Sequence, residues 1–186
     1  LLKKLGTLDV ATICPLHGPI LTENLGYYLH LYDIWSRYDV ETEGIFTAYA
    51  SIHGGTAEAA EHLAELLRAK GAAKVAITDL CRCDMAEAVE DAFRYGTMVV
   101  AAASYDGSVF TPMHDFLHRL QSKNYQKRRV GIVENGSWAP CAGRVMREML
   151  QSQKEITFVE PTVTIRSRLK TSDLPQLERL ADALLA

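Results

Sequence analysis

The segment Gly44–Glu58 combines residue types that can bind a phosphate group. Its first half is apolar and β-prone and ends at Ala50; its second half is small and hydroxylated and runs Ser51, Ile52, His53, Gly54, Gly55, Thr56. Apolar residues then recur at spacings of three and four, which indicates a helix. Glycines let backbone N–H groups approach a ligand closely, and the first N–H groups of a helix are unpaired and carry partial positive charge. A strand, a glycine turn and a helix in this order therefore predict an anion site.

The donor set of this segment favours a single phosphate monoester. No Lys follows the glycines, which argues against a nucleoside-triphosphate loop, and the spacing is not the Gly-x-Gly-x-x-Gly of dinucleotide-binding proteins. The hydroxyls of Ser51 and Thr56 add donors to the backbone N–H groups. An ordinary strand-to-helix turn of an α/β protein has the same pattern, so this segment alone leaves both interpretations open.

The composition is that of a globular chain of 186 residues, with 48% hydrophobic and 23% charged residues. A net charge of -3 argues against electrostatic binding to nucleic acid, and no apolar run reaches the length of a membrane span. No secretory signal is visible, and the four cysteines form no Cys-x-x-Cys pair, so we expect a reduced, cytoplasmic protein. The chain begins with Leu1, from which we expect a piece of a longer polypeptide.

Beyond residue 44 the pattern alternates between strand and helix. Continuous apolar runs such as Val75–Thr78 and Met98–Ala103 are typical of strands buried on both faces, while Asp84 and Pro112 mark helix starts. The predicted strands are 45–50, 74–78, 97–103, 129–134 and 156–165. The predicted helices are 56–69, 85–94, 112–121, 140–150 and 173–185. This succession predicts an α/β fold with a doubly wound, five-stranded parallel sheet and helices on both faces.

The amino-terminal segment has a different pattern. Val10–Cys14 predicts a short strand, and His17 lies in the turn that follows; a lone His beside Gly and Pro is usually a loop residue, with a metal ligand as the alternative. Residues 22–38 predict a helix with Thr22 as its N-cap. Its apolar stripe predicts a packing surface and consists of Leu25, Tyr28, Leu29, Tyr32 and Trp35. We place the domain boundary in the acidic linker Asp39–Glu43.

Three loops should converge at one edge of the predicted sheet, because ligands of such folds bind beyond the carboxyl ends of the strands. The loop after the first strand is Ser51–Thr56. The loop after the third strand runs Ser104, Tyr105, Asp106, Gly107, Ser108, and the loop after the fourth runs Glu134, Asn135, Gly136, Ser137, Trp138. Tyr105 and Trp138 suit contact with a flat ring, with packing on the sheet edge as the alternative. A phosphate site beside two aromatic loops without cations indicates flavin mononucleotide (FMN).

These loops resemble the three flavin loops of the flavodoxin-like domain of flavodiiron proteins, also called A-type flavoproteins. The segments Pro112-Met-x-Asp-Phe-Leu and Lys123-Asn-Tyr are also similar, and the resemblance covers essentially the whole chain. It implies strand order 2-1-3-4-5. It also implies the cofactor-binding set Ser51, Ile52, His53, Gly54, Gly55, Thr56, Ser104, Tyr105, Asp106, Gly107, Ser108, Asn135, Gly136, Ser137 and Trp138. Two departures concern Gly55, where the family often has Asn, and Ala102-Ala103-Ser104-Tyr105, where it often has Ser-Pro-Thr/Ser-Tyr.

The resemblance also implies a domain organisation. Thr12-Ile-Cys-Pro-Leu-His17-Gly-Pro is similar to the last segment of the family's metallo-β-lactamase-like domain, in which the equivalent His is the final iron ligand. Residues 1–21 would be the end of that domain, 22–43 the linker helix, and 44–186 the flavodoxin-like FMN-binding domain. The family's other iron ligands, including a His-x-Glu-x-Asp-His run, are not in this sequence, so we expect neither a metal site nor catalytic residues.

The function implied by the resemblance is that of an electron-transfer domain of an oxygen or nitric oxide reductase, an oxidoreductase of which this chain alone would be catalytically incomplete. The implied partners are the diiron domain, a rubredoxin-like or NAD(P)H-dependent reductase donor, and a second copy of the chain. Asp106 and Glu134 would lower the flavin potential by their charge, and the Gly107 peptide would turn toward the ring. The alternative is an interaction or dimerisation module that has lost flavin binding; a flavin-dependent quinone reductase would need a nicotinamide site, of which the sequence shows no feature.

Overall fold

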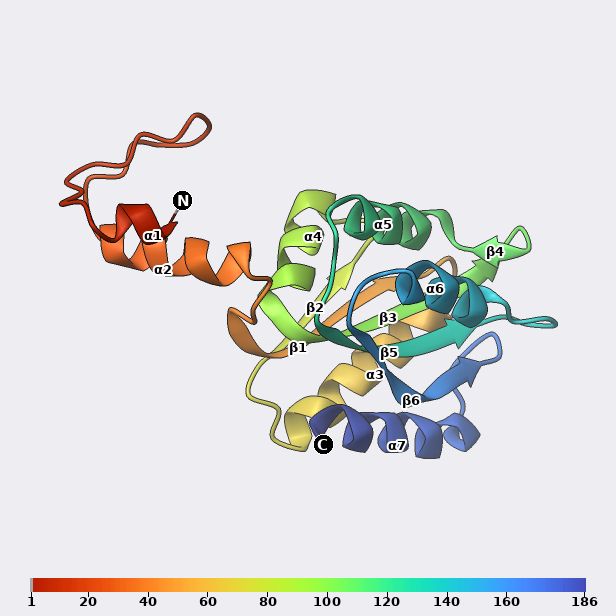
Figure 1. The fold of residues 1–186 in the computed structure, drawn as a ribbon. Coiled ribbons are helices and arrows are strands. Elements are labelled where there is room, and N and C mark those ends of the chain that lie inside the picture. Colours follow the sequence, from red (N-terminus) through yellow and green to blue (C-terminus); the bar gives the residue numbers. More distant parts are fainter. Residues whose placement is uncertain (1) are drawn as a thin grey trace.

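The computed structural model describes residues 2–186 and has a sheet between two layers of helices (Figure 1). Its parallel strands are β1 (Thr42–Ala50), β2 (Val75–Asp79), β3 (Tyr95–Tyr105), β5 (Arg128–Asn135) and β6 (Ile156–Ile165). Their spatial order is β2-β1-β3-β5-β6, and the short strand β4 (Ser108–Val109) pairs antiparallel with the end of β3. The predicted parallel sheet with order 2-1-3-4-5 is therefore confirmed, with one small antiparallel addition.

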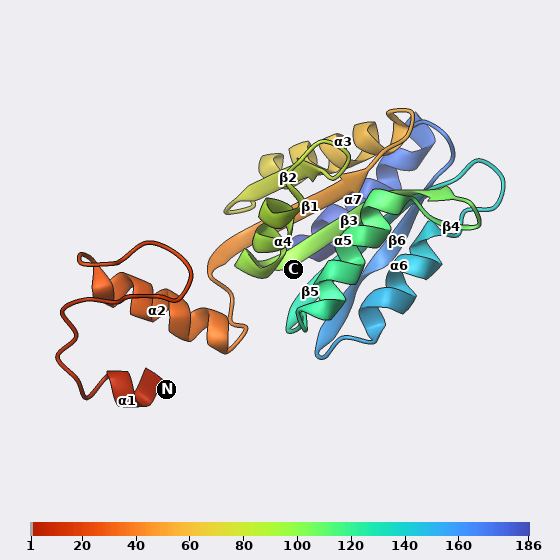
Figure 2. The same ribbon diagram turned by 90° about the horizontal axis from the view of Figure 1, so that it is seen from above.

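Five helices cover the two faces of the sheet (Figures 1 and 2). On one face lie α3 (Gly55–Ala69) and α7 (Leu174–Leu185), the latter preceded by the short 3-10 helix η1 (Thr171–Asp173); on the other lie α4 (Met85–Arg94), α5 (Thr111–Ser122) and α6 (Ala142–Gln151). Adjacent residues of β3 serve separate cores, because strand side chains alternate between faces. Met98 packs in the core beneath α4–α6, and Val99 packs in the core beneath α3 and α7.

The helices and strands of the α/β body lie close to their predicted positions, but β2 is less buried than predicted. β3 is buried on both faces as expected, whereas β2 is only half-buried because it is an edge strand. The Asp84 side chain accepts a hydrogen bond from the Ala86 N–H at 2.8 Å, which confirms the predicted cap of α4. Pro112 lies in the first turn of α5, also as predicted.

The amino-terminal segment extends away from the α/β body and holds α1 (Leu2–Leu5) and α2 (Leu25–Ser36) (Figure 1). The predicted strand at 10–14 is wrong: only Ile13 forms a bridge, with Leu21, because no longer strand runs beside it. The predicted Thr22 cap is also wrong, since α2 begins after Asn24, whose backbone is left-handed at φ 53°. No residue of α2 is fully buried, but Tyr28, Leu29 and Tyr32 line a pocket together with Leu5, Ile13 and Leu21, so the apolar stripe faces the amino-terminal segment.

Arg128, at the start of β5, ties the end of α2 to the sheet. Its side chain is 2% exposed, and its guanidinium donates to the carbonyls of Tyr38 at 2.7 Å, Asp39 at 3.2 Å and Phe93 at 2.5 Å. Lys127 adds a hydrogen bond from Nζ to the Arg37 carbonyl at 2.9 Å. These cations therefore fix the linker mainly through backbone carbonyl groups, with the Asp39 carboxylate 3.9 Å from Lys127 Nζ as an additional ion pair.

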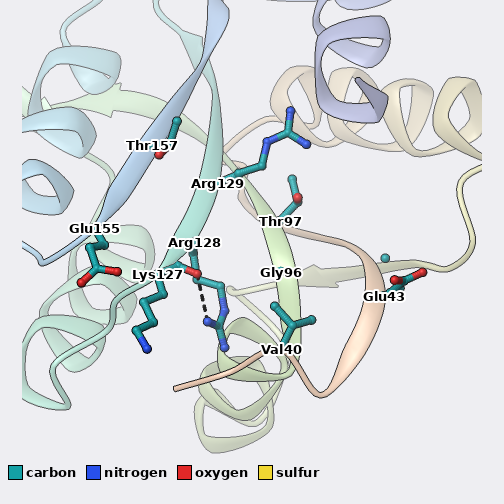
Figure 3. A pocket seen from close by; sticks show the side chains of 10 residues that line it. Val40, Glu43, Gly96, Thr97, Lys127, Arg128, Arg129, Glu155 and Thr157 are labelled. Atoms are coloured by element: carbon teal, nitrogen blue, oxygen red, sulfur yellow. Dashed lines mark hydrogen bonds between the residues drawn. The ribbon is translucent and has the colours of Figure 1, made fainter. Parts of the chain in front are cut away.

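A cavity of about 490 Å³ lies beside this joint, at the amino edge of the sheet. Figure 3 shows Lys127 and Glu155 on one side of it and Glu43 on the other, with Arg128 donating to the Lys127 carbonyl at 3.0 Å. The cavity lies at the opposite edge from the three predicted cofactor loops. Within residues 2–186, no helix is both long and apolar enough to cross a membrane.

Replacing Arg128 by Met should lower the free energy of unfolding by about 2–4 kcal/mol, because several partly buried carbonyls would lose their donor. Urea denaturation followed by circular dichroism measures this change. The control is Arg179→Met, an exposed position on α7, which should change stability little. Equal stability of the two variants would contradict a central role for Arg128.

Candidate cofactor site

The start of α3 presents unpaired hydrogen-bond donors at the carboxyl edge of the sheet. Its N-cap is Gly54, with φ 92° and no side-chain cap. The first helical bond runs from the Glu58 N–H to the Gly54 carbonyl at 2.9 Å. The preceding N–H groups, from Gly55, Thr56 and Ala57, have no acceptor among the described residues. They face outward from the positive end of the helix dipole, as a phosphate site requires.

Two hydroxyl groups complete this donor set. Ser51 Oγ accepts the Gly54 N–H at 3.1 Å, which leaves its own proton free to donate. The Thr56 side chain is only 2% exposed, and its hydroxyl bonds to no other residue in the described part of the chain. Three N–H groups and two hydroxyls, all donors, suit the oxygens of a phosphate monoester.

Gly55 is required by a close approach of another loop. A Cβ at this position would lie 2.1 Å from the Ser167 carbonyl oxygen and 3.1 Å from the Arg168 Cα. A larger residue therefore cannot fit unless the loop after β6 moves. The departure from the family's Asn at position 55 thus has a physical reason in this chain.

The second predicted loop is a β-hairpin. Tyr105 of β3 pairs with Ser108 of β4, and the two residues between them, Asp106 and Gly107, have φ 48° and 70°. Positive φ at both central residues is the signature of the tight hairpin turn that Asp-Gly favours. The Tyr105 ring is 46% exposed and meets the Phe110 ring edge-on at 5.6 Å between centroids, so the hairpin holds an accessible aromatic face.

The third loop carries the most exposed aromatic residue of the described chain, Trp138, at 93% exposure. Asn135, just before it, is nearly buried and is bonded to the loop after β6. Its Nδ2 donates to the Ser167 carbonyl at 2.8 Å, and its Oδ1 accepts the Ser167 N–H at 3.0 Å. The hydroxyls of Ser137 and Ser167 lie 2.9 Å apart. Asn135 thus holds two loops together.

Two polar side chains near these loops cap α6. Ser104 Oγ accepts the N–H groups of Cys141 at 2.9 Å and Ala142 at 3.1 Å, and its own proton remains free to donate. Glu134 accepts the Gly143 N–H at 2.8 Å and the Thr164 hydroxyl at 2.9 Å. Glu134 therefore lies in β5 with its charge turned to the helix start, and not in the loop as the sequence suggested.

Sequence reasoning missed a fourth loop, residues 166–170, which follows β6. It contains Arg166, Arg168 and Lys170, so the expectation of a site without cations is wrong. Arg166 Nη1 lies 3.4 Å from the carbonyl oxygens of both Ser137 and Trp138. The signal was present in the sequence, because a basic run directly after a parallel strand must emerge at the same edge as the other loops.

The structure brings all the predicted site residues to this one edge (Figure 1). The strand ends are in register there: Ala50 pairs with Ala102, Ala103 with Asn135, and Asn135 with Ile165. Among residues 2–186, no group of three or more His, Cys, Asp or Glu side chains could hold a metal ion. His17 lies in the amino-terminal segment before α2, outside the α/β body.

The strand order and the loops at the carboxyl edge define a flavodoxin-like α/β protein. No family model matches the sequence. An uncharacterised protein of Methanocaldococcus jannaschii is 22% identical over 186 residues, which are 97% of this chain and 47% of that protein. A Synechocystis protein described as diflavin flavoprotein A 2 is 24% identical over 136 residues, which are 73% of this chain and 23% of that protein.

Solved structures agree with this assignment. The rubredoxin:oxygen oxidoreductase of Desulfovibrio gigas matches with a TM-score of 0.86 at 19% identity, over 98% of this chain and 46% of its own. The flavodiiron protein of Giardia intestinalis gives a TM-score of 0.83 at 15% identity, over 98% and 45%. A Bacillus cereus flavodoxin gives 0.67 at 17% identity, over 77% and 97%. The resemblance to flavodiiron proteins is confirmed, and this chain spans about half the length of those proteins.

Gly55→Ala should destabilise the protein by about 1–3 kcal/mol, because the new methyl group collides with the Ser167 carbonyl. It should also speed hydrogen exchange in residues 166–170 as that loop is displaced. The matched control is Gly26→Ala in α2, where nothing lies within 4 Å of the added Cβ. Unchanged exchange in the loop would contradict the close approach.

Proposed function

We propose that residues 44–186 are the FMN-binding electron-transfer domain of a flavodiiron-type oxygen or nitric oxide reductase. The observation that carries the proposal is the free start of α3 beside two loops with exposed aromatic rings. The starts of α4 and α6 differ, because side chains already accept their N–H groups. Pro112 and Pro175 each remove one first-turn N–H from α5 and α7, so α3 is the helix that keeps its full set of first-turn donors free.

The residues of each loop have distinct roles in this proposal. The N–H groups of Gly55, Thr56 and Ala57, with the hydroxyls of Ser51 and Thr56, hold the phosphate. Tyr105 and Trp138 flank the flat ring and shield it from water. Bound FMN would supply the redox chemistry, and the protein binds and orients it.

The boundary at residue 43 is supported by the extent of the flavodoxin match. That match covers 77% of this chain, the same fraction that residues 44–186 make up. In this proposal residues 1–21 are the end of a metallo-β-lactamase-like domain, and 22–43 are a linker helix. His17 would contribute one ligand to a diiron centre whose other ligands belong to the rest of that domain.

The partners follow from the position of the linker. It joins the sheet at the amino edge, whereas the cofactor loops lie at the carboxyl edge (Figure 1). The diiron domain of the same chain would thus lie far from the flavin, which favours a homodimer in which a second copy supplies the electron acceptor. We propose a rubredoxin-like or NAD(P)H-dependent reductase as the donor, and a cytoplasmic location.

Thr56→Val should weaken FMN binding about 10- to 100-fold, because one hydrogen bond to a charged group is lost. Riboflavin, which lacks the phosphate, should bind this variant as it binds the unaltered protein. Thr22→Val in the amino-terminal segment is the control, and fluorescence titration is the measurement. Equal losses for both ligands would place the phosphate elsewhere; an apoprotein that binds neither would favour the interaction-module alternative.

FMN binding should quench tryptophan emission strongly, because Trp138 lies in the third loop, which we place against the flavin ring. Trp138→Ala should remove most of this quenching, whereas Trp35→Phe should retain it, since Trp35 lies in α2. Loss of quenching in the Trp35 variant instead would show that the third loop does not contact the ring.

A further inference from the structure

The loop after β6 concentrates positive charge at the cofactor edge. Residues 166–170 contain three cations and no acid. The first loop contains only His53 as a titratable group, the hairpin contributes Asp106, and residues 136–140 are uncharged. Arg82, in the loop after β2, lies 3.7 Å from the Asp79 carboxylate and is thereby partly neutralised.

This loop lies directly against the start of α3. α7 packs beside α3, so the connection from β6 to α7 crosses in front of the α3 first turn (Figures 1 and 2). The Arg168 Cα would be 3.1 Å from a Cβ at Gly55. Its neighbour Ser167 is fixed by both polar groups of the Asn135 amide. The backbone of Arg168 is therefore anchored next to the free N–H groups.

Arg168 differs from the other two cations of the loop. Arg166 lies near the Ser137 and Trp138 carbonyls, and the Lys170 Nζ donates to the Arg166 carbonyl at 3.1 Å. Arg168 is exposed and has neither an ion pair nor a side-chain hydrogen bond within the described residues. Its guanidinium is thus available to a ligand at the α3 start.

The charge balance of the site favours such a group. A helix start supplies roughly half a positive charge, whereas a phosphate monoester carries about -1.5 to -2 at neutral pH. We propose that Arg168 is the cationic ligand of the phosphate monoester, donating charge-assisted hydrogen bonds to its oxygens opposite the α3 N–H groups. This proposal rests on the proposed function and adds a fourth loop to the cofactor site.

The test compares FMN and riboflavin affinities of the apoprotein by fluorescence titration. Arg168→Gln should weaken FMN binding about 10- to 100-fold and leave riboflavin binding unchanged. Arg168→Lys should retain part of the lost affinity, because it keeps the charge but not the planar fork. Arg179→Gln, an exposed arginine of α7, is the control and should bind both ligands normally.

Salt and pH provide independent readouts. FMN affinity of the unaltered protein should fall with added salt and rise between pH 5 and 7, as the phosphate loses its second proton near pH 6. Both dependences should be weaker in Arg168→Gln.

Unaltered FMN affinity in Arg168→Gln, together with a selective loss in Thr56→Val, would overturn this inference and leave the proposed function intact. Equal losses of FMN and riboflavin in Arg168→Gln would also overturn it, because the residue would then act on the loop fold. An unaltered protein that binds neither ligand would overturn both proposals.

Discussion

The cofactor edge depends on the pair of hydrogen bonds between the Asn135 amide and the Ser167 backbone. Together with the bond from the Gly136 N–H to the Ile165 carbonyl at 3.1 Å, they extend the β5–β6 pairing beyond the strands. A buried amide that uses both its donor and its acceptor fixes the loop direction strongly. The loop after β6 is thereby turned toward Gly55, which has no side chain to obstruct it. The first, third and fourth loops thus form one connected unit.

Every helix that follows a parallel strand points its amino end at this same edge, so the fold creates several anion sites at once. The chain's own side chains accept the first N–H groups at two of these five helices: Asp84 on α4, and Ser104 and Glu134 on α6. The N-cap of α3 is Gly54, which has no side chain to accept the first N–H groups, so these donors stay free. Side-chain caps at α4 and α6, and Pro in the first turn of α5 and α7, therefore distinguish the start of α3 from the other helix starts.

At the amino edge of the sheet, Arg128 fixes the direction of the linker. Arg128 donates to carbonyls of the linker and of α4, so it joins segments that are 35 or more residues apart in the sequence. Its cost of burial is offset by carbonyl dipoles, and burial lowers its pKa from the ordinary value. The linker consequently leaves the sheet in a fixed direction, away from the cofactor loops. This separation of the two edges is the reason that a second copy of the chain enters the proposed function.

The sequence by itself determined the sheet order through its resemblance, most element positions through hydrophobic periodicity, and the glycine turn Ser51–Thr56 between β1 and α3. The element positions and the glycine turn are local features, because strand alternation, helix spacing and turns depend on near neighbours. Its predictions failed at the strand at 10–14 and the Thr22 cap, where no regular pattern constrains the chain. Only the tertiary structure decided that Glu134 faces the start of α6, and that Ser167 and Arg168 lie against Gly55. Each of those contacts joins distant segments through β6 and α7 packing, which periodicity within a single segment does not encode.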